Sequence, residues 1–295
     1  MTSFHSTYIL ALIAIVLSCS GSEDSDINKE VIRDGMDEGN ELIDSTDLRD
    51  FEEDANEAFD VIDTLESMSG ILETPVKLGG KLLNSSTYHE DELDSSWFDQ
   101  DWYLLYRDSD KVCYLEKVDI LYSRVNDPIL DGDEGATGWK IETDFTDPHE
   151  EIILMSNVGE LEEGEVIEIN LMDDVVAPAE QEDIVHMGQE FFLRGYGKSK
   201  KVSEEFMILQ DYYLIYGAVT SEGKKTRQLI THFEFFDDAM LQILFVGDID
   251  QDGIPDLMID NRNKYNSFVP TLFLSGSAKS PYLLNQVATV SSVGC

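Results

Sequence analysis

Apolar and polar residues alternate in short runs along most of the chain after residue 70. Short apolar runs with β-branched and aromatic residues, bounded by turn residues, are typical of β-strands. Turn residues separate the runs, which indicates antiparallel pairing and predicts a mainly β fold, either an antiparallel β sandwich or an open barrel. The predicted strands are Lys77–Leu83, Trp102–Arg107, Lys111–Ile120, Ile152–Ser156, Glu165–Leu171, Gln189–Arg194, Glu204–Ala218, Leu229–Phe236, Gln242–Val246, Thr271–Leu274 and Leu284–Val290.

We divide this β region into residues 71–217 and 218–295. A break is suggested by the polar stretch Ser221–Lys225. On either side of it, Tyr212–Ala218 and Arg227–Phe235 have the pattern of a β-hairpin. The two stretches are therefore expected to form one continuous domain.

A helical pattern precedes the β region, because apolar residues between positions 46 and 70 fall three and four positions apart. These residues are Phe51, Ala55, Phe59, Ile62 and Leu65. The spacing predicts an amphipathic N-terminal helix over 46–70. Its apolar stripe would pack on the β domain, or it would dock on a partner in a larger assembly.

The first 18 residues have the organisation of a secretory signal peptide. The apolar run Tyr8–Leu17 suits a signal core and is too short to span a bilayer. The sequence Leu17-Ser18-Cys19 resembles a bacterial lipobox, which implies lipidation of Cys19 and anchoring in the outer membrane or at the cell surface. An ordinary secretory peptide would instead leave the protein periplasmic or secreted. Residues 19–45, rich in Ser, Asp and Glu, predict a disordered acidic tether.

Four aspartates gather near the C-terminus, in Gly247-Asp-Ile-Asp-Gln-Asp-Gly-Ile-Pro-Asp256. The first three aspartates stand at every second position, so a curled backbone can direct their carboxylates to one point. Gly253 permits the sharp turn. Such an array of oxygens suits Ca²⁺, which takes six to eight oxygen ligands. Apolar, partly β-branched flanks favour strands over the helices of an EF-hand. The alternative is a solvated acidic turn between two strands.

The motif Gly-Asp-x-Asp-x-Asp-Gly-x-x-Asp-Leu between strands is similar to the calcium loops of FG-GAP and VCBS-type repeats. Residues 240–295 as a whole look like the C-terminal end of uncharacterised bacterial secreted proteins with a single such loop. The resemblance implies a set of calcium ligands, and it offers no activity to carry over to this chain. The implied ligands are the carboxylates of Asp248, Asp250, Asp252 and Asp256 and the backbone carbonyl of Ile254.

Charge and cysteine content restrict the partners further. The 295-residue chain has 61 acidic and 20 basic residues and a net charge of −41, which argues against nucleic acid or anionic lipid surfaces as partners. If Cys19 is lipidated, Cys113 and Cys295 remain. They either form one disulfide in an oxidising compartment or stay as two unpaired thiols.

Two further stretches each have two interpretations. The acidic loop around Asp131 and Asp133 is either a second cation site or a solvated turn. The aromatic residues from Trp97 to Tyr106 form either a glycan-binding face or part of the core.

No motif of a nucleophile, a phosphate loop or a zinc site occurs in the sequence. We therefore predict a calcium-binding surface or outer-membrane lipoprotein with a non-catalytic binding or scaffolding role toward a glycan or protein ligand. The alternative is a secreted hydrolase, of polysaccharide or a similar substrate, with a structural calcium.

Overall fold

The computed structural model describes residues 60–62, 70–77, 79–127, 129–132, 135–201, 207–220, 222–237 and 239–293. These residues form β-strands and a single 3-10 turn at Ser95–Trp97, which confirms the mainly β prediction. No sheet among them closes into a barrel. Within the same residues, no helix is long and apolar enough to cross a membrane. The predicted signal peptide, Cys19, the acidic tether and Cys295 lie outside the described residues.

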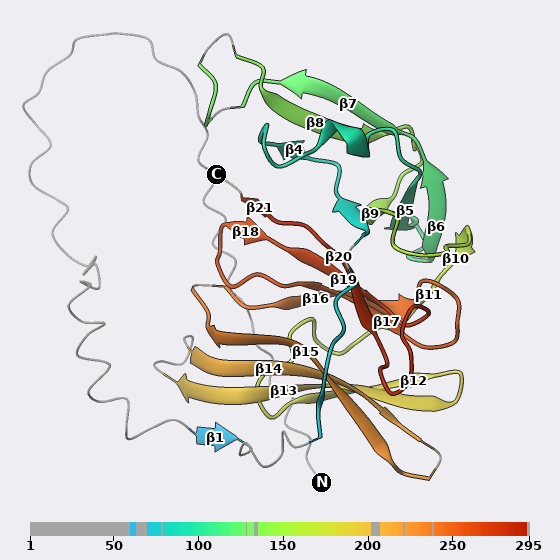
Figure 1. Cartoon of the computed structure of the whole chain (residues 1–295), viewed down its shortest axis with the longest axis vertical. Helices are drawn as coiled ribbons and strands as arrows, with labels where there is room; N and C mark the ends of the chain where they lie inside the picture. The colour runs from blue at the N-terminus through green and yellow to red at the C-terminus, as the bar shows by residue number, and fades with distance from the viewer. Residues whose placement is uncertain are drawn as a thin grey trace, which may run out of the picture. The chain divides into compact units, whose positions relative to one another are not determined.

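The longest strands belong to a six-stranded sheet, which is antiparallel except for the contact of β15 with β2 (Figure 1). Its strands are β1 (Asp60–Ile62), β13 (Gln189–Lys201), β14 (Met207–Val219), β15 (Lys225–Phe235) and β2 (Leu72–Glu73) in spatial order, with β12 (Gln181–His186) also on β13. The predicted hairpin is present, since β14 and β15 pair from Val219 and Lys225 onward. A short turn joins them, in which Gly223 N–H donates to the carbonyl of Thr220.

A five-stranded antiparallel sheet forms the central layer. In spatial order its strands are β11 (Ile167–Glu168), β16 (Gln242–Asp248), β17 (Asp256–Asp260), β19 (Pro270–Leu274) and β20 (Asn285–Thr289). Every residue of β17 and β19 is buried. Because strand side chains alternate between faces, a strand buried along its whole length requires cover on both faces.

Two further sheets and a two-stranded pair complete the described part. A second five-stranded sheet contains β10 (Gly164–Glu165), β6 (Cys113–Val118), β5 (Trp102–Arg107), β9 (Glu150–Ser156) and β3 (Lys81–Leu83). A three-stranded sheet contains β4 (Thr87–Tyr88), β8 (Gly138–Thr143) and β7 (Ile120–Val125). The pair is β18 (Ser267–Phe268) with β21 (Ser292–Val293).

Three apolar clusters pack these sheets against one another. On one face of the central sheet, Met258 belongs to a cluster with Leu105 and Leu115 of the second five-stranded sheet. On the other face, Leu257 belongs to a cluster with Leu214 of the six-stranded sheet. A third cluster joins the far face of the second five-stranded sheet, through Leu104, to the three-stranded sheet. The central sheet is therefore held on both faces by apolar contacts.

The helix predicted over 46–70 is wrong at residues 60–62, which form β1. Asp60, Val61 and Ile62 pair with Ser199, Lys198 and Gly197 of β13. Two β-branched residues in succession favour an extended backbone, and the sheet edge supplies hydrogen-bond partners that a sequence pattern does not reveal. The rest of the predicted stripe, Phe51, Ala55, Phe59 and Leu65, lies outside the described residues.

Candidate metal centre

The aspartate motif lies at one end of the central sheet, in the loop between β16 and β17. These strands are antiparallel neighbours, with Gly247 opposite Asp256, so the loop returns directly on itself. Gln251 and Gly253 adopt left-handed backbone angles, with φ of 58° and 88°. Glycine adopts left-handed backbone angles without strain. Two residues with such angles let a short loop curl around one point.

The curled loop brings three of the four aspartates together. Asp248, Asp250 and Asp256 each offer a carboxylate oxygen, and these oxygens lie within 4.8 Å of one another. Asp248 is 4% exposed and Asp256 is fully buried. Carboxylates this close together, two of them removed from water, repel one another unless a cation or a proton lies among them. This group could hold a metal ion.

The Asp256 carboxylate fixes the geometry of the loop. Its Oδ2 accepts hydrogen bonds from the backbone N–H of Ile249 at 2.7 Å and of Asp250 at 3.2 Å. Its Oδ1 accepts from Ser275, at 2.8 Å from the N–H and 3.1 Å from the hydroxyl. Asp256 therefore ties the loop to the end of β19, the next strand of the central sheet.

Two buried carboxylate oxygens have no hydrogen-bond partner in the described residues, namely Asp248 Oδ1 and Asp250 Oδ1. The other oxygen of each carboxylate accepts a backbone N–H, from Gly253 at 3.0 Å and from Gly276 at 2.9 Å respectively. A buried charged oxygen without a partner is costly. A bound cation would satisfy both oxygens at once, so the donor set fits a metal ion.

The pKa values of two of the aspartates reflect the same crowding. Burial raises the pKa of Asp250, and the neighbouring charges of Asp252 and Asp248 raise it further, against the lowering effect of the Gly276 N–H. Burial and the charge of Asp250 raise the pKa of Asp256 well above its ordinary value. Without a cation, these carboxylates are therefore hard to keep ionised.

The other two predicted ligands, Asp252 and the Ile254 carbonyl, lie beside Ser275. Asp252 is exposed and does not belong to the three-carboxylate group. Its Oδ1 accepts from the Ser275 hydroxyl at 2.8 Å and from the Ile254 N–H at 2.9 Å. The carbonyl of Ile254 lies 3.3 Å from the same hydroxyl. In this arrangement both residues contact Ser275.

Sequence reasoning missed two residues at this centre. His186, at the end of β12, is buried, and its Nε2 lies 3.3 Å from Asp248 Oδ2. Ser275 follows β19 and donates to Asp256 and Asp252. Nothing in the motif points to His186, 62 residues upstream, whereas a hydroxyl directly after a buried strand of the same sheet was a weak signal for Ser275.

In the acidic loop predicted as a possible second cation site, the described carboxylates form hydrogen bonds with other residues of the protein. Asp127 is buried, with Oδ2 at 2.5 Å from His89 Nδ1 and Oδ1 accepting from Ile129 N–H. Asp131 Oδ2 accepts from the backbone N–H groups of Asp127 and Thr137. The described carboxylates therefore shape the turn, while Asp133 lies outside the described residues.

The aromatic stretch contributes to the core. Trp102 is fully buried, Phe98 and Tyr106 are 8% exposed, and all three belong to the third apolar cluster. Because these residues are buried, they do not form the exposed stacking face that was the alternative interpretation.

Cys113 is also buried, so one half of the predicted disulfide lies in the core. The pairing with Cys295 stays a prediction.

The chain was compared with protein-family models, with curated proteins and with solved structures, and none of them matches it.

Proposed function

We propose that this protein binds one calcium ion at the Asp248–Asp250–Asp256 group and that the ion stabilises the central sheet. The observation that supports this most directly is a pair of buried oxygens, Asp248 Oδ1 and Asp250 Oδ1, that have no hydrogen-bond partner in the described part of the chain. They belong to carboxylates that already share one small volume. The site motif and its likeness to FG-GAP and VCBS-type calcium loops agree with this assignment.

Calcium is favoured among the metals by the donor atoms. The three gathered side chains offer only oxygen, which suits hard cations such as Ca²⁺ and Mg²⁺ and not the softer transition metals. Mg²⁺ requires a near-ideal octahedron and keeps several of its waters, whereas Ca²⁺ accepts irregular shells of mixed carboxylate and carbonyl oxygens. Three carboxylates on an irregular, curled loop therefore favour Ca²⁺.

The role of the ion follows from where its ligands are anchored. Asp248 ends β16, Asp256 begins β17, and hydrogen bonds connect Asp256 to Ser275 at the end of β19. These three strands are neighbours in the sheet that contributes to two of the apolar clusters. An ion that binds this folded loop and not the unfolded chain stabilises the fold by mass action.

We further propose that the folded domain has a non-catalytic binding role on a lipoprotein anchored at the outer membrane or cell surface. The support for the anchor is the lipobox-like Leu17-Ser18-Cys19, followed by an acidic, polar stretch. A structural ion suits an extracellular setting, where calcium is available to weak sites. Mass spectrometry of the membrane-extracted protein tests the anchor through the added mass on Cys19.

Thermal melting tests the calcium site. The purified protein is melted in chelator, in calcium, in magnesium and in zinc, beside Asp248→Asn and the control Asp173→Asn. Asp173 is exposed, so the control removes the same charge away from the group. We expect calcium to raise the Tm of the wild type and of the control much more than the Tm of Asp248→Asn. Equal shifts in all three proteins, or none, would refute the site.

A further inference from the structure

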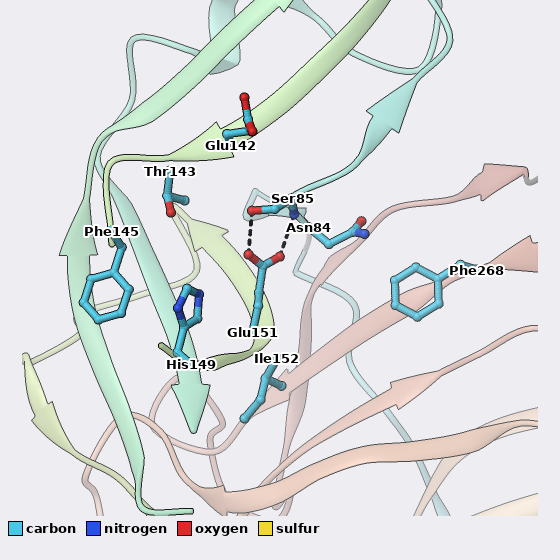
Figure 2. A pocket seen from close by; sticks show the side chains of 9 residues that line it. All are labelled: Asn84, Ser85, Glu142, Thr143, Phe145, His149, Glu151, Ile152 and Phe268. Atoms are coloured by element: carbon cyan, nitrogen blue, oxygen red, sulfur yellow. Dashed lines mark hydrogen bonds between the residues drawn. The ribbon is translucent and has the colours of Figure 1, made fainter. Parts of the chain in front are cut away.

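A second feature of the fold is an open cleft of about 560 Å³ beside the end of β8, the start of β9 and β18. Figure 2 shows Phe145 and His149 on one side of Glu151, and Asn84 and Phe268 on the other. Its volume lies within the range of ligand pockets in proteins. None of the residues of the aspartate group lines it.

The carboxylate of Glu151 is held in place by Ser85. Oε1 accepts from the Ser85 N–H and Oε2 from its hydroxyl, both at 2.6 Å, as the dashed lines in Figure 2 mark. These donors orient the carboxylate without neutralising its charge, because both are uncharged. The lone pairs that remain on both oxygens can accept further hydrogen bonds from a ligand.

His149 adds a second acceptor. Its Nδ1 lies 2.7 Å from the backbone carbonyl of Asp147, and a carbonyl oxygen can only accept, so we assign the proton to Nδ1. In the neutral ring Nε2 then has the free lone pair. No Lys or Arg occurs among the described residues that line the cleft. The second lining carboxylate, Glu142, is paired with Lys140 at 2.8 Å, which leaves Glu151 as the main anionic group.

Aromatic rings provide the apolar part of the lining. Phe145 packs edge-on against His149, with ring centroids 4.9 Å apart, and its ring is tilted against that of Tyr106, with centroids 4.7 Å apart. Phe268 contributes a second ring from β18. Rings present a negative face, which attracts cations as well as apolar groups. The lining thus combines a fixed carboxylate, acceptors and electron-rich rings.

We propose that this cleft binds a small organic ammonium ion whose carbon skeleton packs against Phe145 and Phe268 while its charged amino group contacts Glu151. Anions are disfavoured by the acceptors of the cleft and by the net charge of −41, which attracts cations over long range. The inference deepens the binding role proposed above, and it does not depend on the calcium site.

The probe is 2-phenylethylamine, which is protonated at neutral pH and has one ring and one amino group. Its neutral analogue 2-phenylethanol and a disaccharide are measured beside it by ligand-observed NMR, with the wild-type protein in saturating calcium. We expect the ammonium ion to bind about tenfold or more tightly than the alcohol. We also expect its affinity to fall as salt rises. Equal binding of the alcohol, or binding of the disaccharide alone, would overturn the proposal.

A matched pair of variants locates the interaction. Glu151→Gln keeps the shape and a Ser85 acceptor but removes the charge, and Glu165→Gln removes one charge from an exposed position on β10. The first should weaken binding of the ammonium ion about tenfold, and the second should leave it unchanged. Equal effects would mean that only the overall charge matters, which would refute the site.

The two proposals fail separately. The calcium-dependent rise in Tm is recorded for the same protein samples. A wild-type protein that shows this rise but does not bind 2-phenylethylamine would overturn the cleft assignment and leave the calcium site standing. The comparison of the amine with the alcohol needs no variant, so the cleft remains testable even if Glu151→Gln does not fold.

Discussion

Replacing Asp250 by asparagine should change the stability of the protein in opposite directions with and without calcium. Asp250 Oδ2 accepts a backbone N–H from Gly276, and Oδ1 is buried without a partner among the residues that the structure describes. Asparagine can keep the first interaction through its carbonyl oxygen. Its amide nitrogen then replaces the unpartnered oxygen and can donate to the nearby carboxylate of Asp248.

Without calcium, the substitution removes a buried negative charge and supplies a donor to another. The typical net contribution of a hydrogen bond to stability is about 1 kcal/mol, and we take this value as the expected gain. For a domain of this size, 1 kcal/mol corresponds to a Tm change of about 2–4 °C. We therefore expect Asp250→Asn to melt above the wild type in chelator.

With calcium, the order should reverse. At a free calcium concentration one hundred times the dissociation constant, the ion stabilises the wild type by about 2.7 kcal/mol. That corresponds to a Tm rise of about 5–11 °C. Loss of one carboxylate ligand weakens binding, so Asp250→Asn should show only a small part of this rise and melt below the wild type.

Differential scanning calorimetry of both proteins, in chelator and across a calcium series, measures the two effects. Asp173→Asn, which removes an exposed carboxylate, is the matched control and should follow the wild type throughout. If Asp250→Asn were the less stable protein in both conditions, the unpartnered oxygen would not destabilise the metal-free state. The physical reasoning for the site would then be wrong.

Three further predictions concern other parts of the fold. The hydrogen bond to Asp127 raises the pKa of His89 in the folded protein. The stabilisation from this hydrogen bond is therefore complete below the ordinary pKa of 6.5 and is lost as pH rises through the higher pKa of the folded state. His89→Gln should therefore lower stability most at pH 6 in urea melts, and a difference independent of pH would contradict this. Gly247→Ala should cost about 1–3 kcal/mol in urea unfolding, because a Cβ there would meet backbone of β11, and an unchanged midpoint would contradict it. In denaturant without reductant, alkylation should leave Cys113 unmodified if the predicted disulfide exists, and its labelling would refute the bridge.

The strand pattern and the aspartate loop could be predicted because both depend on local sequence. The apolar runs of β16 and β19 follow from their burial in the core, and the β14–β15 hairpin follows from two long runs around a short polar turn. The gathering of Asp248, Asp250 and Asp256 follows from spacing on a curled backbone.

Other features depend on contacts between distant segments, which spacing does not encode. His186 reaches Asp248 from a strand of another sheet, and the cleft combines β9 with β18, more than 100 residues apart. The helix prediction was wrong at residues 60–62 because pairing with β13 outweighed the local helical pattern. The full burial of β17 likewise results from sheets on both of its faces.

Calcium titration of the metal-free protein by isothermal calorimetry tests the central claim most directly. The account predicts one ion bound per chain, with binding strongly weakened in Asp248→Asn and retained in Asp173→Asn. Failure of the wild type to bind calcium, or equal binding by Asp248→Asn, would contradict the assignment of the aspartate group as a calcium site.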